Sequence, residues 1–140
     1  FEKKKWPPYL NGPGSKDIIF NELMIDWDSE VVLVEGVFDA IAVGNNAIPL
    51  LGSTLRDDSK LFSRIVSEDA SVVIALDYDA CDKSLQIAKK LLSYDIEVRF
   101  VDTSGYKDVA EMSKPILTQR LREAPFLSTD GYLERKAKAI

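Results

Sequence analysis

The chain has 140 residues, of which 46% are hydrophobic and 29% charged, and its formal net charge is −5. This length suits one domain that buries roughly two-thirds of the surface of the unfolded chain, and no apolar stretch approaches the ~20 residues that a membrane span needs. Histidine is absent and Cys81 is the only cysteine, which excludes a Ser-His-Asp or Cys-His triad, an intrachain disulfide, and a nitrogen and sulfur ligand set for zinc.

The negative net charge argues against a protein that binds nucleic acid through a uniformly basic surface. Basic residues gather at Lys3, Lys4 and Lys5 and again among residues 114–140, where the solvent-exposed face of a helix is the simpler interpretation. Bound divalent cations would reverse the sign of an acidic cluster, so an interaction with nucleic acid stays open. Position 1 is Phe rather than Met, and we therefore expect a piece of a longer protein.

The N-terminal part of the chain is predicted to be a connector followed by a helix. Residues 6–14 contain three prolines and two glycines, which favours an extended, turn-rich segment. Ser15 or Asp17 could cap a helix over residues 18–25. The apolar stripe expected on that helix comprises Ile19, Phe20, Leu23 and Met24.

Four short apolar runs predict buried strands, and they comprise residues 31–34, 47–51, 71–76 and 97–101. Pro49 is better tolerated at the edge of a sheet than at its centre. Helices are predicted at residues 38–45, after a cap at Asp57 or Asp58, and at residues 83–94, 114–122 and 132–140. Strands that alternate with helices are typical of an α/β fold, here a Rossmann-like parallel sheet of about four strands with helices on both faces.

Each predicted helix between the strands has an apolar face. The residues expected on these faces are Phe38, Ile41, Ala42 and Val43, then Leu61, Phe62, Ile65 and Val66, and then Leu85, Ala88, Leu91 and Leu92. Lys83, Lys89 and Lys90 are expected to point into solvent.

Carboxylates follow the first and third predicted strands. Glu35 ends the first, and Asp77 and Asp79 end the third. Gly36 is expected to let the chain turn sharply, which places Asp39 in the first turn of the next helix. Because ligands of open α/β sheets bind beyond the carboxyl ends of the strands, we expect these acids to face one crevice. Helix capping is the alternative for each acid taken alone.

Several acids in one crevice need neutralisation. Two like charges ~4 Å apart repel by about 4 kcal/mol at an effective dielectric constant near 20. Without histidine, a metal here is held by oxygen atoms, which favours Mg²⁺ or Mn²⁺. Such ions support phosphoryl transfer.

Three segments with these acids resemble the Toprim domain, which primases, topoisomerases and some nucleases share. They are residues 34–40 (Val-Glu-Gly-Val-Phe-Asp-Ala), 77–79 (Asp-Tyr-Asp) and 107–111 (Lys-Asp-Val-Ala-Glu). Residues 51–53 (Leu-Gly-Ser) and the segment 9–20 make the chain most similar to DnaG-type and phage primases.

The resemblance implies a division of the chain and a set of site residues. Residues 1–30 would be a connector and helix from a preceding primase subdomain, residues 31–112 the Toprim core, and residues 113–140 a C-terminal helical segment. Glu35, Asp77 and Asp79 would be catalytic, and the same three with Asp108 would bind metal. The residues implied to support them are Asp39 and Glu111, and those implied to contact nucleotide or template are Lys16, Gly52, Ser53 and Lys107.

The chain departs from the family pattern at two places. The family sequence Asp-Gly-Asp-x-Ala-Gly reads Asp-Tyr-Asp-Ala-Cys-Asp at residues 77–82, so Tyr78 and Asp82 replace glycines. Ala110 stands where some primases have a further acid or asparagine, which leaves Asp108 as the ligand expected from the third segment.

The function implied by the resemblance is DNA-templated synthesis of RNA primers from ribonucleoside triphosphates, with Mg²⁺ or Mn²⁺ as cofactor and no zinc in this chain. The implied partners are single-stranded DNA, ribonucleotides, an N-terminal primase subdomain, a zinc-binding domain and a replicative helicase. We expect a protein of the cytoplasm of a bacterial or phage-infected cell, without a membrane partner and with little activity alone.

Three alternatives stay open at this stage. A Toprim nuclease would use the same acids to hydrolyse phosphodiesters. A non-catalytic Toprim module of the recombination-mediator kind would bind DNA or protein. A topoisomerase fragment is less favoured, because it would need a nucleophilic tyrosine from another domain.

Overall fold

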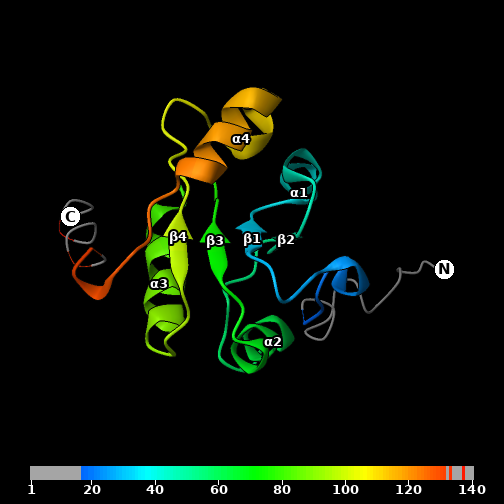
Figure 1. The fold of residues 1–140 in the computed structure, drawn as a ribbon, viewed down its shortest axis with the longest axis vertical. Helices are drawn as coiled ribbons and strands as arrows, with labels where there is room; N and C mark the ends of the chain where they lie inside the picture. Colours follow the sequence, from blue (N-terminus) through cyan, green and yellow to red (C-terminus); the bar gives the residue numbers. More distant parts are fainter. Residues whose placement is uncertain (1–16, 132, 134–136, 138–140) are drawn as a thin grey trace, which may run out of the picture.

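The computed structural model describes residues 17–131, 133 and 137, and shows a parallel sheet with helices on both of its faces (Figure 1). Its elements are η3 (Glu22–Met24), β1 (Val31–Val34), α1 (Val37–Val43), β2 (Ala47–Pro49), α2 (Lys60–Glu68), β3 (Val72–Ile74), α3 (Cys81–Leu92), β4 (Val98–Phe100), η4 (Val109–Glu111) and α4 (Lys114–Glu123). The predicted α/β, Rossmann-like fold class is confirmed.

The four strands pair in parallel in the order β2-β1-β3-β4. In this register Leu33 lies between Ile48 of β2 and Ile74 of β3. β2 is an edge strand, which is where Pro49 was expected, because its missing N–H removes no ladder bond there. All four strands therefore end at the same edge of the sheet, where α1 begins and α4 lies (Figure 1).

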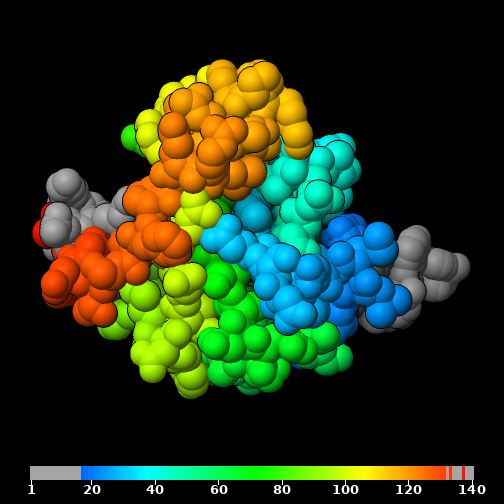
Figure 2. All heavy atoms as spheres, viewed as in Figure 1, coloured from blue at the N-terminus to red at the C-terminus, as the bar shows by residue number. Residues whose placement is uncertain are grey.

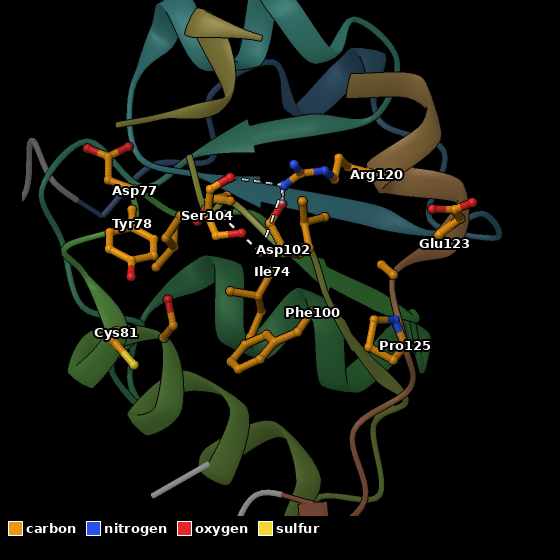
Figure 3. Close-up of a pocket in the computed structure, with 15 residues that line it drawn as sticks. Ile74, Asp77, Tyr78, Cys81, Phe100, Asp102, Ser104, Arg120, Glu123 and Pro125 are labelled. Carbon is orange, nitrogen blue, oxygen red and sulfur yellow. Dashed lines mark hydrogen bonds and ion pairs between the residues drawn. The ribbon is translucent and has the colours of Figure 1, made fainter. Parts of the chain in front are cut away.

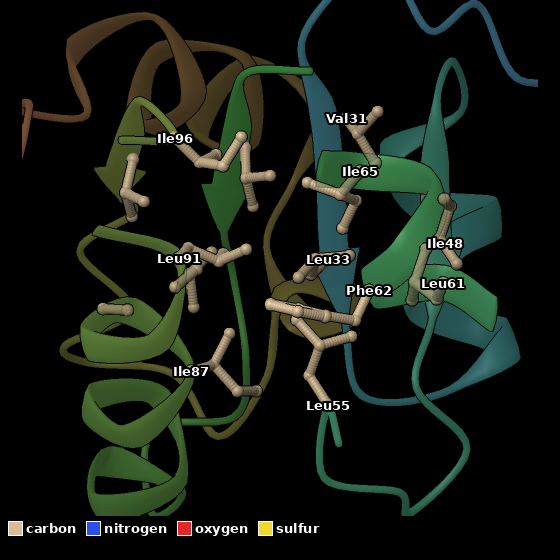
Figure 4. Packing of buried hydrophobic residues seen from close by; sticks show 14 of the residues in the cluster. Val31, Leu33, Ile48, Leu55, Leu61, Phe62, Ile65, Ile87, Leu91 and Ile96 are labelled. Atoms are coloured by element: carbon tan, nitrogen blue, oxygen red, sulfur yellow. The ribbon is translucent and has the colours of Figure 1, made fainter. Parts of the chain in front are cut away.

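The sheet has a hydrophobic core on each face. Val31 and Leu33 point to the face that α2 and α3 cover, and Val32 and Val34 point to the face that α1, η4 and α4 cover. This alternation follows from the two-residue period of a strand. Figure 4 shows side chains of the first core, among them Phe62 from α2 and Leu91 from α3. Continuous apolar runs are required because both faces of the strands are buried.

The apolar face expected on α1 is wrong in part. Phe38 and Ile41 are 80% and 68% exposed, whereas Ala40 and Val43 are buried. The helix presents its small residues and Asp39 to the sheet. The hydrophobic pattern misplaced the buried face of α1, because Asp39 and Ala40 rather than Phe38 face the sheet at the start of this helix.

The predicted helix over residues 18–25 is also wrong. Only the short 3₁₀ helix η3 forms there, and Asn21 before it has a left-handed φ of 64° that interrupts helical geometry. Leu23 and Met24 are 99% and 80% exposed, while Ile19 is buried in the core.

The predicted N-terminal caps of α2 are also wrong. Ser59, rather than Asp57 or Asp58, accepts the hydrogen bond from the N–H of Phe62 at 3.2 Å. Most of the predicted helix at residues 132–140 lies outside the described residues.

Arg99 of β4 holds the C-terminal end of α4. Its guanidinium pairs with both carboxylate oxygens of Glu30 at 2.8 and 3.0 Å, and it donates to the carbonyl oxygens of Leu121, Arg122 and Ala124, each at 2.9 Å. These carbonyl groups belong to the end of a helix and have no intrahelical partner. At the other end of α4, Lys114 donates to the carbonyl oxygen of Ala42, and α4 lies beside α1 (Figure 2).

Replacing Arg99 with methionine is expected to lower the free energy of unfolding by about 3 kcal/mol, because one side chain that is 13% exposed satisfies Glu30 and three carbonyl groups. Chemical denaturation followed by circular dichroism measures the change. Arg56→Met is the control, because Arg56 is 67% exposed and its pair with Asp58 should contribute less than about 1 kcal/mol. Equal losses in the two variants would contradict this account of Arg99.

Among the residues that the structure describes, no helix is long and apolar enough to cross a membrane.

Candidate metal centre

Three carboxylates converge at the carboxyl edge of the sheet. Asp39, Asp77 and Asp108 each offer an oxygen atom, and these atoms lie within 4.8 Å of one another. Asp77 follows β3, Asp39 lies in the first turn of α1, and Asp108 precedes η4. We call these residues the acidic trio. Oxygen ligands at such separations suit a hard divalent cation.

Asp39 is the buried member of the trio, with 7% exposure. One of its oxygens accepts from the N–H of Gly36 at 3.1 Å, and the other accepts from the N–H of Ala110 at 3.3 Å. Burial raises the pKa of the Asp39 carboxyl, and the nearby Asp108 raises it further, while the two N–H groups oppose these effects. Asp39 thus joins the β1–α1 turn to the segment that holds Asp108.

Gly36 does not need the conformational freedom that the sequence suggested. Its φ is −133° and its ψ is 174°, an extended conformation that other residues adopt. A Cβ atom at Gly36 would meet the Asp39 carboxylate at 3.7 Å, an ordinary contact. The positive φ values near the site belong instead to Leu51 and Gly52, at 57° and 82°, in the turn after β2.

Backbone hydrogen bonds bring Asp77 and Asp108 together. The N–H of Tyr78 donates to the carbonyl oxygen of Lys107 at 3.0 Å, which links the segments that follow β3 and β4. Asp108 accepts from the N–H of Glu111 at 3.1 Å, and Glu111 accepts from the N–H of Lys107 at 2.7 Å. Lys107 and Glu111 thus shape this segment.

The pKa of the Asp77 carboxyl is strongly raised. Its pKa is raised from 3.8 to about 6, first by burial and then by the charges of Asp39, Glu35, Asp108 and Asp79. Mutual repulsion among carboxylates is relieved by a proton or by a cation.

Glu35 lies next to the trio and is paired with a lysine. The Nζ atom of Lys83 lies 2.6 Å from one carboxylate oxygen of Glu35, and the two side chains are 19% and 24% exposed. The other oxygen of Glu35 is buried without a hydrogen-bond partner among the described residues. Such an orphaned acceptor is costly and marks a place where a donor or cation fits.

Lys83 is the residue that the sequence argument missed. It was expected in solvent with Lys90, but both are half-buried, and Lys90 pairs with Asp57 at 2.8 Å. One signal could have identified Lys83. It lies in the first turn of the helix that follows the Asp77 segment, and such a turn begins at the carboxyl edge of the sheet.

The remaining predicted site residues are not members of the trio. Asp79 is exposed and is not in the trio, although its charge raises the pKa of Asp77. Gly52 and Ser53 follow β2 beside Glu35, since the N–H of Leu51 donates to the carbonyl oxygen of Glu35 at 3.0 Å. Ser53 donates its hydroxyl to the carbonyl oxygen of Leu50 at 2.7 Å. Lys16 lies outside the described residues.

The two positions where the Toprim motif has glycine do not need one here. Neither Tyr78 nor Asp82 has a positive φ. Tyr78 is 62% exposed, and Asp82 lies in the first turn of α3, where the helix dipole favours an acid.

The comparisons with known proteins give a match in structure and none in sequence. No family model and no curated protein matches the chain. The crystal structure of the Aquifex aeolicus primase, with its zinc-binding and RNA polymerase domains, matches with a TM-score of 0.58 and 24% sequence identity. This chain shares its fold with part of that primase. The match covers 71% of this chain and 27% of the primase chain, so this chain spans about a quarter of that protein.

Proposed function

We propose that this chain is the metal-binding, Toprim-type part of a DNA primase, with residues 31–112 as its core. The reaction would be attack of the 3′-hydroxyl of one ribonucleotide on the α-phosphate of the next, with release of pyrophosphate, directed by a DNA template. The observation that carries the proposal is the convergence of Asp39, Asp77 and Asp108 at the carboxyl edge of a parallel sheet. The fold shared with part of a primase supports it.

The residues present fit Mg²⁺ or Mn²⁺. The donor set consists of carboxylate oxygens, and Glu35 has a buried oxygen without a partner among the described residues. Burial, followed by the charges of the neighbouring carboxylates, raises the pKa of Asp77, and a bound cation would offset both effects. Asp77 and Asp108 would hold the ion from the half-exposed rim of the site. When bound, the ion would lower the pKa of the attacking hydroxyl and neutralise charge on the transferring phosphate.

The other residues would position these ligands and the substrate. Asp39 uses both oxygens to fix the segments that hold the site, so we propose that it is chiefly a positioning residue. Lys83 would orient the Glu35 carboxylate through its 2.6 Å contact. We propose Asp79, Gly52, Ser53 and Lys107, which lie in segments that neighbour the site in the sequence, as candidates for contacts with metal, nucleotide or template.

The partners proposed for this function are single-stranded DNA, ribonucleoside triphosphates, a replicative helicase, and the N-terminal and zinc-binding parts of a primase. With a net charge of −5, this chain contributes little to the electrostatic attraction of a DNA template. We therefore propose that a basic partner subdomain holds the template and that this chain has little activity alone. The proposed location is the cytoplasm of a bacterial or phage-infected cell.

Mn²⁺ titration followed by electron paramagnetic resonance tests the metal site, and incubation with nucleic acid tests the chemistry. We expect the chain to bind Mn²⁺ and Asp77→Ala to lose that binding. We expect no cleavage of single-stranded DNA by the metal-loaded chain in the absence of ribonucleotides. Absence of Mn²⁺ binding would contradict the metal site, and cleavage without nucleotides would replace the primase by a nuclease.

A further inference from the structure

A pocket of about 570 Å³ lies beside the acidic trio, between the carboxyl ends of β3 and β4, the start of α3 and the end of α4 (Figure 3). Its volume falls within the roughly 300–1,000 Å³ that is usual for small-molecule sites. Asp77 lies at one end of the pocket, and Pro125 lies at the other (Figure 3). Because Asp77 also belongs to the trio, a ligand in this pocket would reach the candidate metal centre.

The lining combines an apolar surface with hydroxyl groups that lack partners. Ile74 and Phe100 lie at the middle of the pocket (Figure 3). Ser84 and Thr103 also line it and are each only 9% exposed. Within the described part of the chain, neither hydroxyl group makes a hydrogen bond. Neither hydroxyl oxygen is among the described buried polar atoms that lack a partner, so both are open to the pocket. There they can donate to, or accept from, a ligand with polar edges.

The charges of the pocket disfavour a phosphate group inside it. Of the described residues that line it, Asp77, Asp102 and Glu123 are acidic and Arg120 is the only basic one. Arg120 donates to the carbonyl oxygens of Asp102 and Ser104 (Figure 3), and its guanidinium lies 3.8 Å from the Asp102 carboxylate. Its positive charge is therefore already balanced within the protein, and an uncharged ligand fits better than an anion.

We propose that this pocket binds the nucleoside portion of a ribonucleotide. A base has an apolar face for Ile74 and Phe100, and base and ribose both carry donors and acceptors for Ser84 and Thr103. The phosphates of the same nucleotide then lie toward Asp77, at the metal centre. This assignment rests on the proposed function, because the pocket would be the binding site for the nucleoside portion of the substrate of that reaction.

Ribonucleosides without phosphate test the pocket in the metal-free chain. Adenosine, guanosine, cytidine and uridine are each titrated into the ¹⁵N-labelled protein, and the amide shifts of Thr103 and Ser104 are followed. At least one nucleoside is expected to shift these amides. Thr103→Val and Ser84→Ala are each expected to weaken its binding about fivefold, which corresponds to one lost hydrogen bond.

Two further variants sharpen the test. Ser84→Leu fills the pocket and is expected to abolish binding, and Thr118→Val is the matched control, because Thr118 is exposed on α4 and does not line the pocket. Failure of all four nucleosides to bind overturns the proposal, as does binding that the pocket variants leave unchanged. Inorganic pyrophosphate that binds these residues more tightly than any nucleoside would also overturn it. Mn²⁺ binding is measured separately, so a failed pocket and a failed metal site give different results.

Discussion

Replacing Asp77 with asparagine is expected to weaken Mn²⁺ binding at least about tenfold while making the metal-free protein more stable. Asp77 is one of the two half-exposed members of the trio, and burial together with the charges of Asp39, Glu35, Asp108 and Asp79 disfavours its ionised form. A pKa raised from 3.8 to about 6 means that the ionised group destabilises the fold at pH 7. Allowing for screening by solvent, the neutral amide should add about 1–2 kcal/mol to the free energy of unfolding.

The same shift predicts how stability depends on pH. Between the unfolded pKa of 3.8 and the folded value of about 6, the folded protein binds more protons at Asp77 than the unfolded chain does. The contribution of Asp77 to stability is therefore fully present below pH 3.8 and is lost as the pH rises through about 6. Relative to wild type, Asp77→Asn should gain stability between pH 4 and pH 7.

Thermal denaturation across this pH range, without metal, measures the difference between the two proteins. Asp28→Asn is the control of equal charge, because Asp28 is exposed, precedes β1 and is not in the trio. It should change neither Mn²⁺ affinity nor the pH profile. A destabilised Asp77→Asn, or one with normal Mn²⁺ affinity, would contradict our description of the trio.

Replacing Lys83 with methionine is expected to lower the stability of the protein without lowering its affinity for Mn²⁺, the opposite of the effects expected for Asp77→Asn. The variant should lose about 2 kcal/mol of stability, because Glu35 would keep a poorly solvated carboxylate with neither oxygen paired. Its affinity for Mn²⁺ should not fall, since a positive charge beside the site has been removed. Urea denaturation and the Mn²⁺ titration measure the two effects on the same protein.

A double-mutant cycle isolates the contact itself. Lys83→Met, Glu35→Gln and the double variant should show a coupling energy of about 1–3 kcal/mol. Lys89→Met is the matched control, because Lys89 is an exposed lysine of the same helix. If Lys89→Met lowers stability as much as Lys83→Met, the 2.6 Å contact has no special role.

The sheet was predictable because its strands are buried on both faces. Residues 31–34 are apolar at every position, and such a run predicts a strand in the interior of a parallel sheet. The convergence of Asp77 and Asp39 also followed from topology, since parallel strands end at one edge. The match in structure supports the primase-like fold, while the roles of the individual acids stay predictions.

Other features of the fold and of the site could not be predicted from the sequence, because they depend on contacts between distant segments or on backbone conformation. Nothing local in the sequence places Lys83 against Glu35, because the two residues are 48 positions apart. Apolar periodicity suggested that Phe38 was buried, but the structure buries Asp39 in its place, where backbone N–H groups compensate the charge. Asn21 interrupts a helix that looked amphipathic, through a backbone conformation that a hydrophobic pattern does not report.

The acids stand just past the apolar strands rather than within them. Glu35 directly follows the last residue of β1, and Asp77 follows the buried Leu76. Substitutions at this edge change residues that the apolar core does not require, so the fold can persist when the carboxylates are replaced. Asp39 is the exception, because it is buried and accepts hydrogen bonds from two backbone N–H groups. A substitution of Asp39 would therefore change the stability of the fold and metal binding at the same time.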